Sequence, residues 1–430
     1  MTRGRSEPLT TTDRQPHRPL AGIRVADLSR VLAGPYATML LADMGADVVK
    51  IEHPEHGDDT RSWGPPWAGD QAAYYLSLNR GKRSLAIDLK DPEGLAAVRE
   101  LCAGADVVVQ NFRPGVIERL GLGYEQVKKL NPGVVYCSIS GFSSGHSPAG
   151  RAGFDVIVQG ESGLMSTTGT PGGSPTKIGI PISDVFTGLN AAAAICGALT
   201  GRERTGTGTH VEVSLINSAL SSLVNVAQRG LVTGAEPERF GQAHSTIVPY
   251  QVFPTADAEM IVAAGNDSLY RRLCTAVGRA ELADDPRFAT NPDRVANREV
   301  LVAELTAALS AKGAEEWLPI LTAAGVPVGK VRGVLEAIRA ADASGDAATI
   351  TVDHPTLGDL ELVRAGFRFD SPTPEADAAV LPPPLLGQHS TAVLEGLGLT
   401  DEQIAGLVAR GVVNQNGQTR STTRRGADHR

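Results

Sequence analysis

Cysteine is scarce in this chain, which has four among its 430 residues. The four are far apart and lie in apolar surroundings. None belongs to a CxxC or paired Cys/His pattern at the spacing of a metal site. We therefore expect reduced core thiols and no bound metal ion. The four are Cys102, Cys137, Cys196 and Cys274.

An excess of basic residues is also missing, since 40 Lys and Arg stand against 48 Asp and Glu, giving a net charge of −8. Nucleic-acid binding would require clustered Lys and Arg on one face, so we expect no such partner. No segment approaches the roughly 18 apolar residues of a membrane span, and the N-terminus lacks the apolar core of a signal peptide. The sequence therefore predicts a cytoplasmic protein without a membrane partner. Residues 1–18 and 414–430 are polar and without periodicity, which predicts disordered tails.

Common cofactor and phosphate motifs are absent. The first strand–helix turn, SRVLAGPYA, has one glycine where the dinucleotide motif GxGxxG requires three. The motifs GxxxxGKS/T and HExxH do not occur. The glycine-rich segment 169–179 does not lead directly into a helix, so a flexible loop is a better interpretation than an anion-binding loop. We expect no tightly bound cofactor.

The order of elements predicts an α/β fold. Apolar runs alternate with helical periodicity from residue 23 onward, and Asp91 and Pro92 form a typical helix start. Alternating strands and helices build a doubly wound, parallel, Rossmann-like sheet. The predicted strands are 23–28, 46–52, 83–89, 105–112, 133–142 and 209–215, and the main predicted helices are 35–45, 91–104 and 217–231.

The texture of the sequence changes after residue 231. A loop-rich stretch is followed by a lone predicted strand at 257–265 and a helical region over 267–340. We therefore expect a large domain over 19–231, a smaller domain with linkers over 232–340, and a return to the large domain over 341–413. Two helical stretches near the end are expected to pack back onto the large domain.

One carboxylate interrupts a small, apolar stretch, GIPISDVFTGLNAAAAICGAL, at residues 179–199. Asp184 falls between a predicted strand end and an Ala-rich helix. By spacing alone a helix cap is the commoner role for such an aspartate. The free backbone N–H groups and the positive end of the helix dipole are expected to keep it ionised.

Several sequence blocks, in order, resemble the class III CoA-transferase family over residues 20–412. They are LAGIRVADLSRVLAGPYATMLLADMGADVVKIEHPEHGDDTR (20–61), LNRGKRSLAIDLK (78–90), NFRPGVIERLGLGYE (111–125), GFDVIVQGESGLMSTTG (153–169), RTGTGTHVEVSLINSAL (204–220) and PPLLGQH (383–389). The resemblance implies a large Rossmann-like domain built from both chain ends, a smaller inserted domain, and a homodimer with interlocked chains.

The resemblance makes Asp184 the covalent nucleophile. Its carboxylate would attack an acyl-CoA thioester to give a mixed anhydride, and then form an aspartyl-CoA thioester before CoA passes to a second acid. Asp155 matches an acidic residue that helps to position the reacting acyl group. The alternative for Asp155 is a loop aspartate whose oxygens accept hydrogen bonds from backbone amides.

The same family contains α-methylacyl-CoA racemases, which exchange a proton through a histidine in a GHD block. This chain has GFD instead, so Phe154 stands where the histidine would be. Because phenylalanine cannot carry a proton, transfer is favoured, with an acyl-CoA racemase or epimerase as the alternative. A non-catalytic CoA-binding protein is disfavoured because the nucleophile and its loop are present.

The resemblance also implies contacts with CoA, which would be a substrate together with a small carboxylic acid. Arginines suit phosphate oxygens, although a solvated surface position is equally common. The implied CoA-binding residues are Arg30, Val31, Leu32, Ala33, His53, Ile87, Lys90, Asn111, Phe112, Arg113, Arg119, Ala152, Gly153 and Phe154.

The acids themselves stay open at this point. Gly241 and His244, in the segment 239–253, are implied substrate contacts, although His244 equally fits an ordinary loop histidine. Leu32 stands where formyl-CoA transferase has glutamine, which puts formyl-CoA in doubt as the donor. Arg80 would suit a second carboxylate. His210 and His389 are interpreted as structural.

Overall fold

The computed structural model describes residues 18–142, 151, 153–369 and 380–415. These residues belong to two compact units. The first contains the described residues up to Ser162, Gly179–Val224 and those from Ala347 onward, and the second contains Gly163–Ile178 and Asn225–Asp346. Segment 163–178 therefore differs from the sequence interpretation, which assigned it to the large domain. Ala152 and most of the two predicted tails lie outside the described residues.

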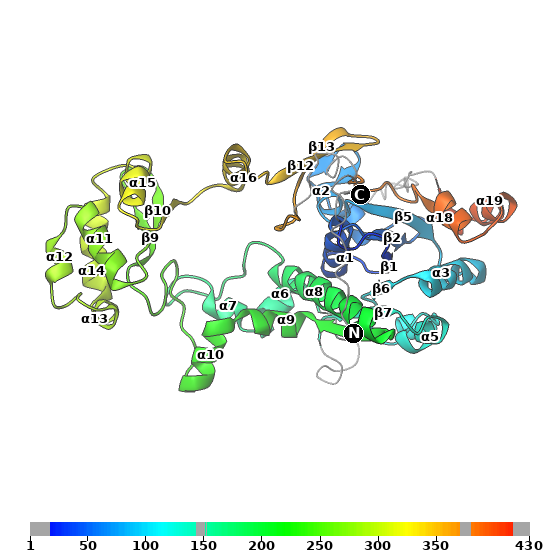
Figure 1. The fold of residues 1–430 in the computed structure, drawn as a ribbon, viewed down its shortest axis with the longest axis horizontal. Coiled ribbons are helices and arrows are strands. Elements are labelled where there is room, and N and C mark those ends of the chain that lie inside the picture. The colour runs from blue at the N-terminus through cyan, green and yellow to red at the C-terminus, as the bar shows by residue number, and fades with distance from the viewer. Residues whose placement is uncertain (1–17, 143–150, 152, 370–379, 416–430) are drawn as a thin grey trace, which may run out of the picture. The chain divides into compact units, whose positions relative to one another are not determined.

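Seven of the described strands of the first unit form one sheet (Figure 1). Its order is β14-β5-β2-β1-β6-β7-β8, with β14 antiparallel and the other neighbours parallel. The predicted α/β class and parallel pairing are confirmed. The strands are β1 (Arg24–Asp27), β2 (Asp47–Glu52), β5 (Lys82–Ile87), β6 (Val107–Gln110), β7 (Val135–Ser140), β8 (Thr209–Ser214) and β14 (Val413–Asn414).

Helices cover both faces of this sheet, because its central strands are continuous apolar runs that must be buried on both sides. In Figure 1, α3 and α5 lie on one side and α1 and α8 on the other. As predicted, Asp91 caps α3 by accepting hydrogen bonds from the N–H groups of Glu93 and Gly94. The helices are α1 (Ala33–Asp43), α3 (Pro92–Gly104), α5 (Tyr124–Leu130) and α8 (Ile182–Thr205).

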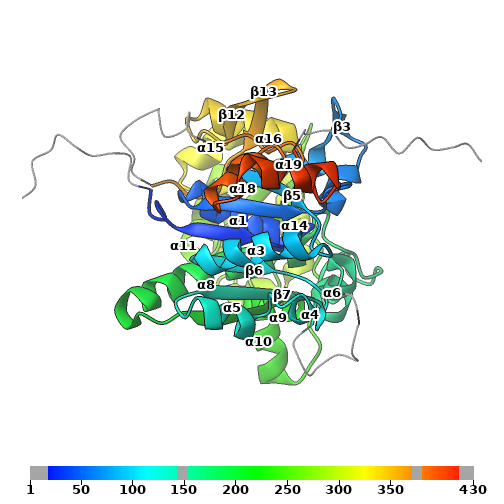
Figure 2. The ribbon, with the colours of Figure 1, turned by 90° about the vertical axis from the view of Figure 1, so that its right-hand side faces the viewer.

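The C-terminal segment returns to the first unit. Helices α18 (Ser390–Gly396) and α19 (Asp401–Ala409) contribute buried side chains to the core shared by α3, α5 and the sheet. In Figure 2 they lie next to β5. The predicted packing of two late helices onto the large domain is confirmed. β14 extends to Asn414, so the first residue of the predicted C-terminal tail belongs to the sheet.

Shorter elements complete the first unit. A hairpin of β12 (Thr349–His354) and β13 (Gly358–Val363) follows the return of the chain from the second unit. The others are the 3-10 turn η1 (Asp59–Ser62), β3 (Trp67–Ala68), β4 (Gln71–Ala72), α2 (Ala73–Leu76), α4 (Val116–Arg119), α6 (Asp155–Glu161) and α9 (Leu215–Ser222).

The second unit packs helices on a small antiparallel sheet. The expectation of a lone strand at 257–265 is wrong, because β10 lies between β9 and β11. β9 is bounded by prolines, which weaken a strand signal in sequence. The elements are α7 (Leu164–Thr167), α10 (Val224–Thr233), β9 (Tyr250–Pro254), β10 (Glu259–Ala263), α11 (Asp267–Ala276), α12 (Glu281–Asp284), α13 (Asn291–Ala296), α14 (Arg298–Leu309), α15 (Ala314–Ala323), β11 (Val328–Lys330) and α16 (Val334–Ala343).

Two further expectations are corrected. The predicted helix 217–231 is two helices, because the φ angle of Val224 is +38°, which an α-helix cannot accommodate. Helix α8 has the length and mean hydropathy, 1.4, of a membrane span. It contacts α1, α9 and β7, and a core helix passes the same test, so this property is weak support for a span.

The cysteines agree with the expectation of reduced thiols, because all four are free. Burial raises the pKa of Cys102 and Cys137 to about 12, so neither thiol forms a thiolate readily. Over the described ranges, no group of three or more His, Cys, Asp or Glu side chains could hold a metal ion.

Candidate active site

Asp184 is the third residue of α8 and lies in its first turn. The N-cap of this helix is Pro181, and no side chain caps it, so the helix-cap interpretation of Asp184 is wrong. The carboxylate is half-buried. Within the part of the chain that the structure describes, no hydrogen bond or ion pair involves the carboxylate oxygens of Asp184. A carboxylate in this setting is available for chemistry.

The pKa of Asp184 is raised to about 7, first by burial and then by the negative charge of Asp155. The expectation that the helix start keeps this carboxylate ionised is therefore only partly right, because with this pKa about half of it is protonated at pH 7. Loss of hydration and a nearby like charge outweigh the favourable helix dipole. Acidic groups with such raised pKa values are common at catalytic sites.

Asp155 is the first residue of α6 and connects this helix to the start of α8. Its Oδ1 accepts a hydrogen bond of 2.8 Å from the backbone N–H of Ser183. Its Oδ2 accepts one of 2.7 Å from Nε2 of Gln159. The alternative interpretation, a loop aspartate held by backbone amides, is thus only partly right. Asp155 fixes the residue that precedes the candidate nucleophile.

Close packing of two helices brings the first turn of α8 to the start of α1. A Cβ atom on Gly188 would lie 2.8 Å from the carbonyl oxygen of Ala33 and 2.9 Å from a ring carbon of Tyr36. Such distances leave no space for a side chain. Glycine at this position therefore lets α8 pack against α1, one turn after Asp184.

The first strand–helix turn lies where the strand order reverses. β1 lies between β2 and β6, and the carboxyl ends of β1 and β6 form the switch point at which doubly wound sheets bind ligands. Arg30 follows β1 and Asn111 follows β6. The N–H of Arg30 donates to Asn111 Oδ1 over 2.9 Å, and Asn111 Nδ2 donates to the carbonyl of Arg30 over 2.7 Å.

The start of α1 leaves backbone donors at this switch point. The N–H groups of Leu32, Ala33 and Gly34 donate no backbone hydrogen bond within the described ranges, and Pro35 has no N–H. Helix starts of this kind favour anions such as phosphate. Since the side chains of Leu32 and Ala33 are buried, a ligand would meet only their backbone. The prediction that Leu32 and Ala33 contact CoA is therefore limited to their backbone groups.

The other sequence-predicted CoA residues also follow parallel strands at this edge of the sheet. His53 follows β2 and stacks on His56, with ring centroids 3.9 Å apart. Arg30 lies 5.6 Å from the ring centroid of Phe112. Ile87 ends β5 with its side chain buried in the core, so a contact of this residue with CoA would come from its backbone. Lys90, Arg113 and Arg119 form no ion pair over the described residues.

The loop before α6 is the last of the predicted CoA-binding segments. Gly153 and Gly141 approach so closely that a Cβ atom on Gly153 would lie 2.3 Å from the Cα of Gly141. Phe154 is 59% exposed. An aromatic ring in this position offers apolar surface and no proton.

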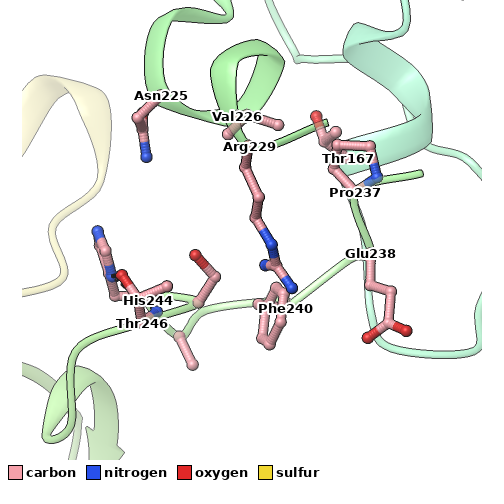
Figure 3. Close-up of a pocket in the computed structure, with 12 residues that line it drawn as sticks. Thr167, Asn225, Val226, Arg229, Pro237, Glu238, Phe240, His244 and Thr246 are labelled. Carbon is pink, nitrogen blue, oxygen red and sulfur yellow. Dashed lines mark hydrogen bonds between the residues drawn. The ribbon is translucent and has the colours of Figure 1, made fainter. Parts of the chain in front are cut away.

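Gly241 and His244 belong to the second unit, where both line a cavity of about 410 Å³ (Figure 3). Figure 3 shows the Arg229 side chain extending to the Phe240 ring, and its guanidinium carbon lies 5.7 Å from the ring centroid. The Nδ1 of His244 accepts a hydrogen bond of 3.2 Å from the N–H of Thr246. The lining combines the cationic side chain of Arg229 and the acidic side chain of Glu238 with hydroxyl and apolar groups, a composition that suits a small polar molecule.

Tyr74, in α2, was missed in the sequence. Burial raises the pKa of its hydroxyl to about 12, and the negative charges of Asp184 and Asp155 add to the effect. The hydroxyl therefore lies in the electric field of both carboxylates and stays protonated. No motif surrounds this tyrosine, and only tertiary structure connects it with Asp184.

Arg80 does not fit the suggested role in binding a carboxylate. Its guanidinium pairs with Asp43 at 2.6 and 2.9 Å and donates to the carbonyl of Val363. It precedes β5, at the edge of the sheet opposite the switch point. His210 stacks on Tyr124, and His389 Nδ1 accepts from the N–H of Ser84. Both histidines have structural surroundings, as expected.

Comparison with known proteins shows the family of this chain. The model of CoA-transferase family III matches residues 20–390. Succinyl-CoA:glutarate CoA-transferase from Mus musculus is 40% identical over 93% of this chain and 91% of its own length. Succinate–glutarate CoA-transferase from Agrobacterium fabrum is 44% identical over 88% of this chain and 96% of its own length.

Solved structures agree as well. A CAIB/BAIF family protein from Brucella suis is similar with a TM-score of 0.76 at 40% identity, over 89% of this chain and 100% of that one. A protein from Mycobacterium tuberculosis is similar with a TM-score of 0.76 at 30% identity, over 88% of this chain and 100% of that one. With a family match over most of its length and relatives that are CoA-transferases, this chain is a transferase that belongs to CoA-transferase family III.

Proposed function

We propose that this enzyme moves CoA from a short dicarboxylic acyl-CoA to a second dicarboxylic acid, with Asp184 as covalent nucleophile. The observation that carries this proposal is the half-buried Asp184 carboxylate, which accepts no hydrogen bond from the described residues. It stands in the first turn of α8, and α8 packs through Gly188 against the start of α1.

The reaction proceeds through two kinds of covalent intermediate. One oxygen of ionised Asp184 attacks the acyl carbon of the donor thioester, and CoA leaves as the thiolate, which gives a mixed anhydride. The thiolate then attacks the Asp184 carbonyl carbon, which releases the donor acid and forms an aspartyl-CoA thioester. The acceptor carboxylate attacks this thioester and CoA leaves again. The CoA thiolate finally attacks the acceptor acyl carbon and regenerates Asp184.

In each step either a carboxylate displaces a thiolate or a thiolate displaces a carboxylate. No proton is therefore gained or lost overall. Asp155 supports these reaction steps by accepting a hydrogen bond from the Ser183 N–H, which fixes the start of α8. Its negative charge also makes ionised Asp184 less stable, and therefore a stronger nucleophile once deprotonated. Tyr74 stays neutral beside both carboxylates and can donate a hydrogen bond to an anionic group there.

The choice of dicarboxylic acids rests on the relatives. The mouse and Agrobacterium fabrum proteins carry succinyl-CoA, succinate and glutarate in their names. Phe154, 59% exposed, argues against racemisation, because it offers no group that could exchange a proton at an α-carbon. In the second unit, Arg229 lines a cavity and offers a cation for a carboxylate, although Glu238 lines the same cavity.

We also propose that the enzyme is a homodimer. Helices α10 and α16 bury none of their residues in a single chain. Their apolar side chains include Leu231 at 80% and Val334 at 78% exposure. Helices with such faces are normally covered by a partner, and a second copy of the chain is the partner that the family resemblance implies.

The covalent role of Asp184 can be tested by trapping. We expect incubation with succinyl-CoA followed by hydroxylamine to give a hydroxamate on the peptide that contains Asp184, as detected by mass spectrometry. Without succinyl-CoA no adduct should form. Asp184→Asn should give no adduct and no succinyl-CoA:glutarate exchange, whereas Asp155→Asn should still give the adduct more slowly.

Two outcomes would overturn the proposal. One is full transfer activity in Asp184→Ala. The other is exchange of the acyl α-proton with D₂O without any covalent adduct, which would favour the racemase alternative.

A further inference from the structure

A buried ion pair lies beneath the first strand–helix turn. Lys50 of β2 and Asp58, the N-cap of η1, are both fully shielded from solvent, with Nζ 2.8 Å from Oδ2. Burying two charges is costly, and such a pair often contributes little to stability compared with apolar residues of similar size. Its location therefore calls for a role beyond stability.

The peptide groups on either side of Arg30 join it to Ser29 and to Val31. Side chains form hydrogen bonds with the N–H and the carbonyl of both groups. Lys50 Nζ donates to the carbonyl of Ser29 over 3.0 Å. Asn111 binds both the N–H and the carbonyl of Arg30, at 2.9 and 2.7 Å. Asp58 Oδ2 accepts from the N–H of Val31 over 3.2 Å. The Ser29 carbonyl needs a donor, which Lys50 supplies, and the Val31 N–H needs an acceptor, which Asp58 supplies. Apolar side chains at these two positions would leave both backbone groups without a partner.

The turn has a conformation that its own sequence disfavours. Val31 has φ +71°, in the left-handed region that β-branched residues rarely adopt. Such a conformation persists only where surrounding contacts determine it. The next residue, Leu32, precedes the N-terminus of α1 and its unpaired N–H groups. The direction in which α1 presents these groups therefore depends on the conformation of Val31.

The pair keeps its charges across the neutral range. Burial alone would raise the pKa of Asp58, but the charge of Lys50 and hydrogen bonds from Lys50 and Thr60 lower it to about 2. Burial likewise opposes the charge of Lys50, and Asp58, Asp27 and Glu52 together raise its pKa. Thr60 contributes an O–H to Asp58 Oδ1 at 2.7 Å, which fixes the orientation of the carboxylate.

We propose that Lys50 and Asp58 are positioning residues for acyl-CoA binding, which hold the Ser29–Val31 turn in its left-handed conformation so that Arg30 and the start of α1 face the ligand. The proposal rests on the proposed function, in which CoA is the substrate, and on the expectation from the family resemblance that this turn contacts CoA. The pair does not touch the ligand and acts only through the turn.

The test measures CoA affinity by calorimetry together with the KM and kcat of succinyl-CoA:glutarate exchange. Asp58→Asn keeps the shape of the side chain but removes its charge. We expect CoA affinity to fall about tenfold and KM for succinyl-CoA to rise similarly, with kcat changed less than about threefold, because misplacement of a binding group by a fraction of an ångström is costly. Thr60→Val is a milder variant with the same expected direction, should Asp58→Asn fold poorly.

The left-handed turn offers a specific rescue. Glycine adopts positive φ without strain, so in a Val31→Gly background Asp58→Asn should weaken CoA binding by at least about threefold less than in the parent. Equal losses in both backgrounds would overturn the proposal. Asp43→Asn removes another shielded ion pair in the same unit, at the far edge of the sheet, and should leave CoA affinity within about twofold.

Arg30→Ala tests the CoA-binding role of the turn separately from the positioning role of Lys50 and Asp58. Reduced CoA affinity in Arg30→Ala but unchanged affinity in Asp58→Asn and Thr60→Val would refute the positioning role and leave the proposed function intact. Unchanged affinity in Arg30→Ala would instead refute the CoA assignment of the turn. These binding measurements do not depend on the covalent chemistry of Asp184.

Discussion

In the proposed covalent transfer of CoA, Asp184 has to satisfy two opposing requirements. It must be ionised in order to attack, yet a fully hydrated carboxylate with an ordinary pKa is a weak nucleophile. Burial and the charge of Asp155 raise its pKa to about 7, which improves the nucleophile while a useful fraction stays ionised at neutral pH. No hydrogen bond from a described residue stabilises the ionised form and offsets this gain.

The pH dependence of the reaction follows from the same pKa. Because only the ionised form attacks, kcat/KM should fall tenfold for each pH unit below about 7. Asp155→Asn removes the second cause of the raised pKa, so the acidic limb should move to lower pH, although burial keeps it above the ordinary range of an aspartate. Initial rates from pH 5 to 9 measure the acidic limb in the parent enzyme and in Asp155→Asn. An acidic limb that stays in place in Asp155→Asn would contradict this account.

Helix α8 contains glycines that differ in how much space a side chain would have, with Gly188 closely packed and Gly197 open. We predict that Gly188→Ala disrupts the site, because the new Cβ would lie 2.8 Å from the Ala33 carbonyl, which belongs to the backbone and cannot rotate away. Separation of α8 from α1 should cost about 1–3 kcal/mol of stability and lower kcat/KM by about tenfold or more. Thermal unfolding and steady-state kinetics measure the two effects.

Gly197→Ala in the same helix is the matched control. Nothing lies within 4 Å of the position that a Cβ atom would take there, and alanine is the better helix former by roughly 0.5–1 kcal/mol. This variant should be as stable as the parent or more so, with unchanged kinetics. If the two alanine variants behaved alike, close packing at Gly188 would not be what positions Asp184.

The elements of the parallel sheet were predictable because local and global signals agree there. Runs such as Val107–Gln110 are apolar almost throughout, as strands buried on both faces must be. Asp91 and Pro92 mark a helix start by local chemistry alone. β9 and the break at Val224 were not predictable, because prolines hide the strand and a single positive φ divides the helix.

The sequence could propose residues for the candidate site, but it could not predict the energetics of that site. Sequence resemblance identified Asp184, Asp155, Arg30 and Asn111, which the structure brings to the carboxyl edge of one sheet or the adjoining helix starts. The raised pKa of Asp184 could not be read from the sequence, since it depends on burial. Tyr74 carries no motif, and its relation to Asp184 arises from the fold alone.

At the level of the whole molecule, the apolar faces of α10 and α16 are the features that a single chain leaves unexplained. Isolated exposed apolar residues are normal on soluble proteins. Here neighbours occur in pairs, with Leu231 and Val232 at 80% and 75% exposure and Val334 and Leu335 at 78% and 74%. Neither helix contains a buried residue, so the apolar side chains of both offer a surface that a partner can cover.

A homodimer would cover these faces, and charge placed on them should dissociate it. We expect the parent enzyme to have a mass in light scattering about twice the 44.9 kDa of one chain. Val334→Glu combined with Leu335→Glu should shift it toward the monomer, because burial of a carboxylate without a partner is strongly unfavourable. Leu130→Glu, which changes one exposed leucine at the end of α5, should leave the mass unchanged. A parent enzyme that is monomeric at micromolar concentration would mean that α10 and α16 are covered by something other than a second copy.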